Sequence, residues 1–449
     1  MKIKKILFVF LVALIMRIVY AWFFVDASNL ILEDQMMYIQ LAQQYPSTGF
    51  LGVTSERVPG YPLLVSTIYN LFGENNMAVV MVQIFIDSLT CVIIGLIAES
   101  VIPRGFLVAG LISALNLNMI ILSGMILTDT LFLFLFSIFI LLFYHYIKSP
   151  NYFKLFMAIS MLCLSTLVRP VSYYMVFMLL PFIFWFAIQS KWTFRQMLSS
   201  FLMYLIPIVI ILGPIQYRNY HEYDSLSLVS QGGSHILYWV VPAVYQYSDQ
   251  GSYQDGSKLA RSSLKKAIHR DGFNKNLENS FKESSYKMKV AKEVILDIGL
   301  FNALYSWSVG SMINLLLPSV ANAPVVRNIE RPSFYESTGN GFIEKIVNYI
   351  TNTDSLKYLS IISIGFLISL LFFITSIFGF YRMMKFVRYK SKERDVDLFL
   401  FLFFIVVYFL AITGPVIGAK YRLPFESVLT VYFSYAFTML IKNKWHRQC

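Results

Sequence analysis

The chain has 449 residues, of which 57% are hydrophobic and only 14% are charged, and its mean hydropathy is +0.62. So much apolar surface cannot be buried inside a water-soluble domain, and the composition therefore excludes one. The formal net charge of +12 does not indicate a nucleic-acid partner, because the lysines and arginines flank apolar runs, as the positive-inside rule for membrane proteins requires. We expect an integral membrane protein that contacts lipids and no nucleic acid.

Ten apolar runs are the expected membrane-spanning helices, since a span needs about 20 mainly apolar residues. They cover residues 6–24, 77–98, 104–123, 126–147, 153–168, 171–190, 198–217, 356–380, 397–413 and 423–441. Lipid offers the backbone no hydrogen-bond partners, and the runs lack the alternation of strands, so we predict an all-α polytopic fold. Basic clusters place both chain ends and residues 381–394 inside the cell, which leaves residues 25–76 and 218–355 outside.

The first external loop, residues 25–76, starts with a predicted surface helix. Glu33 and Asp34 sit where this helix would begin, a position that capping and the helix dipole favour for carboxylates. One face of the helix then carries Met37, Tyr38, Leu41 and Ala42. An aspartate that opens a surface helix is often only a cap, so the spacing alone leaves a capping role and a catalytic role both open.

A further apolar run, residues 295–320, is long enough to cross the membrane. A crossing there would move the basic cluster at 381–394 to the outside. We therefore expect this run to lie at the outer interface or to re-enter the membrane from the same side.

Two charged residues, Arg17 and Asp87, lie inside predicted spans. A charge at that depth costs roughly 2.5–3.5 kcal/mol on insertion scales, so both side chains should face the helix bundle or a wet cavity. They either pair with each other or line a groove for a lipid donor, and the sequence leaves both alternatives open.

Signatures of several other site chemistries are missing from the sequence. The histidines show no metal-ligand spacing, and no P-loop occurs. Cys91 and Cys163 fall inside spans and Cys449 lies at the predicted cytoplasmic end, so we expect no disulfide framework. A cytosolic nucleotide sugar is therefore a disfavoured donor.

Five short motifs occur in an order that carries more information than any one of them. They are Asp34, Tyr38, Ala42 and Arg57 with the turn Pro59–Leu64, then Thr128–Asp129–Thr130, Arg169–Pro170, Arg218–Asn219–Tyr220 and Lys420–Glu426. This series resembles the GT-C superfamily of lipid-dependent membrane glycosyltransferases, which includes protein O-mannosyltransferases and the aminoarabinose transferases of lipid A. Three departures exist: the order of Glu33 and Asp34 is reversed in many relatives, Lys420 stands where Arg is usual, and residues 225–355 match no motif.

The resemblance implies a reaction in which an acceptor hydroxyl or amine displaces polyprenyl phosphate from the anomeric carbon of a sugar. Such a site needs a base for the acceptor and cations for the phosphate more than the paired carboxylates of a hydrolase. It implies Asp34 as the base, with Glu33 as the alternative, and Asp129 as either a second acidic site or only the polar start of a span. The implied phosphate-binding residues are Arg57, Arg218, Tyr421 and Arg422, and the implied substrate groove contains Tyr38, Tyr61, Arg169 and Asn219.

We expect Arg57, Arg218 and Arg422 to converge on one outward-facing pocket, since a phosphate near lipid needs more than one donor. Each arginine taken singly is equally well explained as a side chain that snorkels to the interface.

The expected organisation is a catalytic membrane module at 1–220, an extracytoplasmic region at 221–355 and C-terminal spans at 356–449. The resemblance implies a bacterial inner membrane, an outward-facing site, an undecaprenyl-type donor and a glycolipid, polysaccharide or protein acceptor. It implies no required cofactor, with a divalent cation as an open alternative. Two other classes stay open: a flippase or transporter of a lipid-linked glycan, which should show repeats and broken spans, and a glycan polymerase or ligase, which should carry its key residues in a late external loop.

Overall fold

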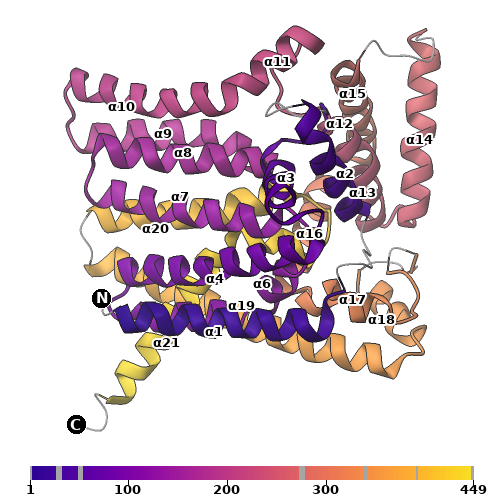
Figure 1. Ribbon diagram of the computed structural model, residues 1–449. Helices are drawn as coiled ribbons and strands as arrows, with labels where there is room; N and C mark the ends of the chain where they lie inside the picture. Colours follow the sequence, from indigo (N-terminus) through magenta and orange to yellow (C-terminus); the bar gives the residue numbers. More distant parts are fainter. Residues whose placement is uncertain are drawn as a thin grey trace.

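The structure is a computed structural model, and it describes residues 3–26, 33–48, 54–272, 279–334, 336–337, 339, 342–390 and 393–445. Throughout these residues the chain forms helices joined by short turns, and this part of the chain contains no strand. The predicted all-α fold is confirmed (Figure 1).

Long apolar helices lie side by side and form the body of the molecule (Figure 1). They are α1 (Ile3–Phe24), α4 (Asn76–Val101), α7 (Asp129–Lys148), α8 (Tyr152–Val168), α9 (Tyr173–Gln189), α10 (Phe194–Pro207), α19 (Leu356–Lys390), α20 (Glu393–Thr413) and α21 (Leu423–Trp445). Within the described residues, seven helical stretches are long and apolar enough to cross a membrane, and a bent pair would make an eighth. The remaining two of the ten predicted spans correspond to α8, which is apolar but 17 residues long, and to α21.

The bent pair corrects the prediction of one continuous span over residues 104–123. Helix α5 (Gly105–Ala114) and helix α6 (Leu117–Ser123) meet at 52°. Asn116 has an extended backbone conformation, and its side chain accepts hydrogen bonds from the amides of Asn118 and Met119, so it caps a new helix instead of continuing the old one.

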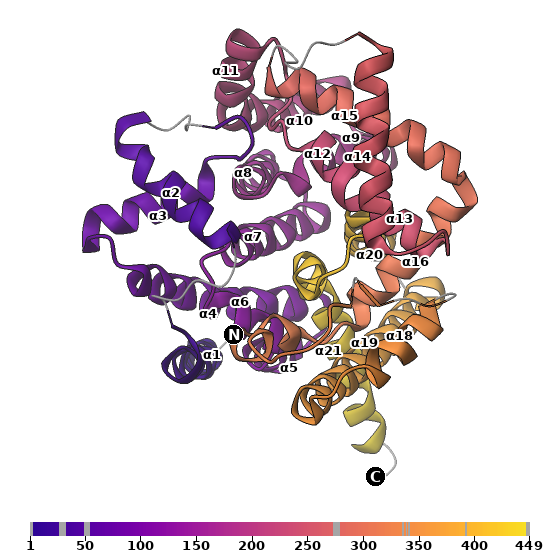
Figure 2. The same cartoon turned by 90° about the vertical axis from the view of Figure 1, so that its right-hand side faces the viewer.

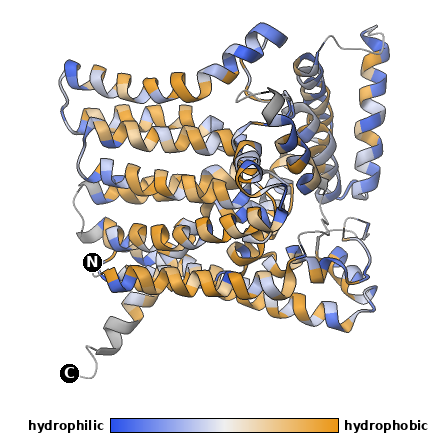
Figure 3. Cartoon of the chain, viewed as in Figure 1, coloured by the Kyte–Doolittle hydropathy of each residue, from blue (hydrophilic) through white to orange (hydrophobic). Residues whose placement is uncertain are grey.

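Both chain termini lie at one end of the bundle, and polar helices gather at the opposite end (Figures 1 and 3). The polar end contains α2 (Glu33–Thr48), α3 (Gly60–Phe72), α12 (Gly232–His235), α13 (Val241–Tyr247), α14 (Tyr253–Arg270) and α15 (Ser280–Ile298). The first two of these are the elements of the predicted external loop, and α2 contains Asp34. The shared position of the termini agrees with the predicted even number of crossings.

Each of two π-helical segments is followed by a proline two residues after its end. They are η2 (Ile208–Leu212), followed by α11 (Gly213–Tyr223), and η3 (Ile236–Val240), followed by α13. A proline lacks an amide donor, and its ring collides with the carbonyl four residues earlier. For Pro214 that residue is Ile210, and for Pro242 it is Tyr238, each at the centre of its π segment. The wider π turn accommodates both effects.

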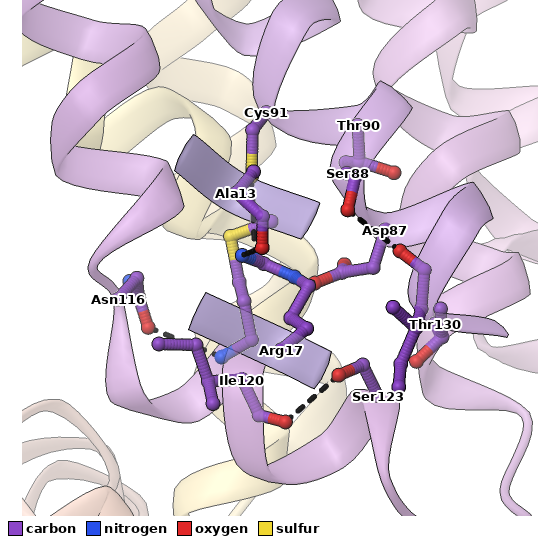
Figure 4. A network of polar contacts seen from close by, with 12 residues as sticks. Ala13, Arg17, Asp87, Ser88, Thr90, Cys91, Asn116, Ile120, Ser123 and Thr130 are labelled. Carbon is purple, nitrogen blue, oxygen red and sulfur yellow. Dashed lines mark hydrogen bonds and ion pairs between the residues drawn. The ribbon is translucent and has the colours of Figure 1, made fainter. Parts of the chain in front are cut away.

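Arg17 and Asp87 pair with each other inside the bundle, which decides between the two alternatives (Figure 4). Arg17 Nε donates to Asp87 Oδ2 at 2.6 Å, and both side chains are buried. The guanidinium also donates to the carbonyls of Ala13 and Ala114 and to Cys91 Sγ. Nearly all of its donors are thereby used, so this pair ties α1 to α4 and to the end of α5 and does not line a donor groove.

The apolar run at 295–320 is interrupted at Gly299, whose φ is +107°, and continues as α16 (Leu300–Leu316). Helix α16 is not among the helices long and apolar enough to cross the membrane. Its interfacial or re-entrant placement stays a prediction. Beyond it come η4 (Ser319–Asn322), α17 (Pro324–Arg327) and α18 (Phe342–Thr351).

Helix α16 holds the turn that leads into η5 (Ala419–Arg422). Asn314 Nδ2 donates to the carbonyl of Val416 at 2.9 Å, and the amide of Gly418 donates to Asn314 Oδ1 at 2.8 Å. Gly310 lies so close to this turn that a β-carbon there would sit 2.5 Å from Pro415 Cα. The position of η5 therefore depends on a helix that precedes it by about a hundred residues.

Candidate functional site

Charged side chains from distant parts of the sequence meet at Asp34, in the first turn of α2. Arg57 Nη2 lies 3.8 Å from Asp34 Oδ1, and Lys420 Nζ lies 3.8 Å from Asp34 Oδ2. These are ion-pair distances and are too long for hydrogen bonds. The Asp34 side chain is 48% exposed, so its carboxylate is flanked by two cations while it stays open to an incoming group.

A second, more deeply buried ion pair joins Asp129 and Arg169. Arg169 Nη1 donates to Asp129 Oδ1 at 2.5 Å. Asp129 is the first residue of α7 and is buried. Arg169 follows α8 in an extended conformation, which the next residue, Pro170, favours because a proline disfavours the helical conformation of the residue before it.

The Tyr421 ring connects the two ion pairs. Arg169 Cζ lies 6.0 Å from the centroid of this ring, and Lys420 Nζ lies 5.8 Å from the same centroid. Both are within the range of a cation–π attraction. We call the resulting series the charge chain. It consists of Arg57, Asp34, Lys420, Tyr421, Arg169 and Asp129.

Tyr38 lies within electrostatic range of both ion pairs of the charge chain. Burial raises the pKa of Tyr38, the positive charges of Arg57 and Arg169 oppose this rise, and the negative charges of Asp34 and Asp129 add to it. The net shift is upward, so the phenol stays neutral and can donate a hydrogen bond at neutral pH.

Tyr61 supports Tyr38 from the bundle side. The two rings meet edge to face with centroids 5.1 Å apart. Tyr61 is fully buried, and its hydroxyl donates to Gln83 Oε1 at 2.6 Å. Gln83 Nε2 in turn donates to the carbonyls of Ser123 and Met125. Tyr61 therefore fixes α3 on α4, and the resemblance gave no indication of Gln83.

Arg57 has an unused hydrogen-bond donor. Within the described part of the chain its Nη1 atom is buried and has no hydrogen-bond partner. Its positive charge also reaches His235, whose pKa is lowered first by burial and then by Arg57. A buried donor without an acceptor costs free energy, which an anionic ligand oxygen would recover.

Arg422 is committed to buried protein groups. Its Nε donates to Glu426 Oε1 at 2.7 Å, its Nη1 to the carbonyl of Leu315 at 2.6 Å and its Nη2 to Ser319 Oγ at 3.0 Å. Asn118 Nδ2 donates to the same Glu426 oxygen at 3.2 Å. Arg422 therefore ties the start of α21 to the end of α16 and to α6.

Arg218 lies near the other end of α2. Its positive charge acts on Tyr45 and opposes the rise in pKa that burial causes there. Its Nε and Nη2 donate to Asn219 Oδ1, and the buried Asn219 donates to the carbonyls of Ser227 and Leu228. The contacts described for Arg57, Arg218 and Arg422 involve different partners, and their convergence on one pocket stays a prediction.

Lys420, which stands where the resemblance implies an arginine, lies at Asp34. The sequence already showed that a lysine stands here in place of the usual arginine. Because Lys420 directly precedes Tyr421, an implied phosphate-binding residue, it could have been predicted as a site residue. The side chain of Glu33, the alternative base, lies outside the described residues.

Among the described residues, no three His, Cys, Asp or Glu side chains form a group that could hold a metal ion. The two carboxylates of the charge chain are each paired with cationic side chains.

Comparison with known proteins finds no matching family model and no matching curated protein. Solved structures do match. The archaeal oligosaccharyltransferase AglB from Archaeoglobus fulgidus, in complex with an inhibitory peptide and a dolichol-phosphate, superposes with a TM-score of 0.54 at 14% identity over 98% of this chain and 50% of that one. The chain has a GT-C fold.

The A. fulgidus oligosaccharyltransferase in its apo form gives a TM-score of 0.55 at 13% identity, again over 98% of this chain and 50% of that one. This chain therefore spans about half the length of the oligosaccharyltransferase that it matches. ArnT from Cupriavidus metallidurans, bound to undecaprenyl phosphate, gives a TM-score of 0.39 at 11% identity over 98% of this chain and 78% of that one.

Proposed function

We propose that this protein is an inverting glycosyltransferase, which moves a monosaccharide from a polyprenyl-phosphate donor of the undecaprenyl type to an extracytoplasmic acceptor. The observation that carries the proposal is the half-exposed Asp34 carboxylate between Arg57 and Lys420. A GT-C fold matched to an enzyme that was solved with a dolichol-phosphate and a peptide supports it.

The chemistry follows from the residues around this carboxylate. An acceptor hydroxyl or amine loses its proton to Asp34 as its oxygen or nitrogen forms a bond to the anomeric carbon. The bond from that carbon to the phosphate oxygen breaks, and the electron pair leaves with the polyprenyl phosphate. A single displacement of this kind inverts the anomeric configuration.

Arg57 and Lys420 are placed to receive the charge that grows on the leaving phosphate. Arg57 brings a buried Nη1 donor that has no hydrogen-bond partner among the described residues. Lys420 is held at the site by its contact with the Tyr421 ring. We assign Arg169 and Asp129 a positioning role, because their short ion pair already uses the carboxylate and because Arg169 lies 6.0 Å from the centroid of the Tyr421 ring.

Two cations beside one carboxylate supply the charge that the reaction needs, so we propose that no cofactor is required. The membrane module at 1–220, the external region at 221–355 and the spans at 356–449 would then share one site, which faces outward from a bacterial inner membrane. The acceptor would be a glycolipid, a polysaccharide or a protein.

Transfer of a labelled sugar tests this proposal. The purified full-length protein in lipid nanodiscs receives polyprenyl phosphate carrying a radiolabelled sugar, together with acceptors extracted from the native membranes. Transfer of the label to extracted material is expected from the wild type. Lys420→Gln should lose at least tenfold in rate, whereas Lys292→Gln, an exposed lysine on α15, should stay within twofold.

Absence of any sugar transfer by the folded wild type would refute the glycosyltransferase proposal. Equal rates for Lys420→Gln and Lys292→Gln would remove the charge chain from the mechanism, even if transfer occurs.

A further inference from the structure

A cavity lies at the polar end of the molecule and contains no member of the charge chain. Its volume is about 430 Å³. It is lined by η3, by the first half of α14 and by residues 333–336 among the described ones, and its principal side chains are Trp239, Tyr253, Gln254, Lys258, Arg261 and Glu336. Figure 2, which faces this end of the molecule, shows α14 beside α13.

Local sequence fixes two walls of this cavity. Ser252 and Asp255 form a reciprocal capping box that starts α14. Gly256 lets α14 approach α13 closely, since a β-carbon there would sit 2.8 Å from Pro242 Cα. Gln254 Nε2 donates to Glu336 Oε1 at 3.1 Å and thereby joins the first turn of α14 to the opposite wall.

The lining has the chemistry that recognises a sugar ring. A pyranose has apolar C–H faces and polar hydroxyl edges, so it is held by an aromatic face together with side chains that donate and accept hydrogen bonds. Trp239 is 52% exposed although it is large and apolar. Gln254 and Glu336 provide donors and acceptors beside it. The volume lies within the range of about 300–1,000 Å³ that is typical of small-molecule sites.

The lining carries two cations, Lys258 and Arg261, and one carboxylate, Glu336. Helix α14 carries five basic residues, Lys258, Arg261, Lys265, Lys266 and Arg270, and one acidic residue, Asp255. Lys258 pairs with Asp255, and Arg270 pairs with Asp271 and Glu293. Arg261 lines the cavity and has no ion-pair partner among the described residues. Its guanidinium is therefore available to a carboxylate or phosphate group.

The segment that lines the cavity also packs toward the charge chain. Trp239 lies in η3, and the next residue, Val240, belongs to a buried cluster against which Tyr421 packs. A glycan held at Trp239 would therefore lie beside the segment that packs against Tyr421 of the charge chain.

We propose that this cavity binds one saccharide unit of an anionic glycan, the acceptor of the transfer reaction. The proposal rests on the proposed function and narrows its acceptor from three classes to one. Trp239 contacts the face of the ring, Gln254 and Glu336 contact its hydroxyl groups, and Arg261 contacts its anionic substituent.

Two measurements with the same variants test the acceptor proposal. Oligosaccharides extracted from the native membranes are separated by anion exchange into acidic and neutral fractions and are labelled with a fluorophore. Binding of each fraction to the full-length protein is measured without any donor. Transfer from labelled polyprenyl-phosphate sugar to each fraction is measured separately.

We expect binding and transfer with the acidic fraction. Trp239→Ala and Arg261→Gln should each weaken binding and raise the acceptor KM at least tenfold, while kcat at saturating acceptor changes less than threefold. Lys265→Gln, an exposed cation on the same helix outside the cavity, is the matched control and should change neither value more than twofold.

The outcomes separate the two proposals. Transfer to the neutral fraction alone, or an unchanged acceptor KM in both Trp239→Ala and Arg261→Gln, would overturn the acceptor proposal and leave the glycosyltransferase intact. Binding of the acidic fraction that depends on Arg261 without any transfer would uphold the saccharide cavity and refute the proposed transferase.

Discussion

The substitution Asp34→Asn separates the catalytic role of this residue from its place at the start of α2. Asparagine is nearly as good a helix cap as aspartate, so a residue that only caps α2 would tolerate the change. The catalytic assignment predicts that the rate of sugar transfer falls by about 10² to 10⁴, since the base is lost. Stability should change by less than about 1 kcal/mol, because the carboxylate is half-exposed and its ion pairs span 3.8 Å.

The structure adds an expectation about the lipid product. Asp34 competes with a bound phosphate for Arg57 and Lys420, so its neutralisation should strengthen the binding of polyprenyl phosphate. Exposed ion pairs are worth about 0.2–1 kcal/mol each. Two such pairs correspond to a gain in affinity of about two- to thirtyfold.

Both effects can be measured on one preparation. Label transfer gives the rate, binding of fluorescent polyprenyl phosphate gives the affinity, and thermal unfolding in detergent gives the stability. Glu33→Gln is the neighbouring control and should lose less activity. If Asp34→Asn turns over at the wild-type rate, Asp34 is excluded as the base. If this variant binds the lipid phosphate more weakly than the wild type, the proposed competition for the two cations is contradicted.

Three further substitutions test other parts of the structure. Arg422→Met should destabilise the protein by about 3–5 kcal/mol because it leaves Glu426 buried and unpaired. Thermal unfolding should show that stability recovers in the double variant with Glu426→Leu. A loss of lipid affinity at unchanged stability would instead show that Arg422 binds phosphate directly. Burial lowers the pKa of Lys345 from 10.5 to about 8, so between these pH values the unfolded state holds more protons than the folded state. The melting temperature should therefore rise by roughly a few degrees as the pH is raised from 8 to 10. Lys345→Met should remove this rise. Gly310→Ala should force Pro415 away, slow sugar transfer and lower the stability by about 1–3 kcal/mol. Gly232→Ala is the control, because its β-carbon would have room, and it should change neither the transfer rate nor the stability.

Composition and periodicity were sufficient to predict the fold class and most helices. The predicted helix after the first span is present as α2. The break at Asn116 was missed, because an apolar run hides a polar residue that caps a new helix. The interruption at Gly299 was missed for a similar reason, since its positive φ depends on packing that a hydropathy pattern does not contain.

The candidate site was only partly predictable, because its residues come from opposite ends of the chain. Asp34, Arg57, Arg169 and Tyr421 were found through motifs, and the structure brings them into one charge chain. Arg422 belongs to the same motif as Tyr421 but pairs with Glu426. That pairing had a visible signal, since an acid four residues after a base on a helix lies on the same face.

The buried pair of Arg17 and Asp87 has a consequence for how the protein enters the membrane. Each charge alone penalises insertion of its helix by roughly 2.5–3.5 kcal/mol, and the penalty is relieved only when the guanidinium meets the carboxylate. Helix α1 is made before α4 and must hold an unmatched cation until α4 emerges from the ribosome. Its release into lipid is therefore favoured after α4 has arrived, so that α1 and α4 leave the insertion machinery as a joined pair. The segment between them, which carries Asp34 and Arg57, is then confined to a loop whose two ends are already fixed beside each other.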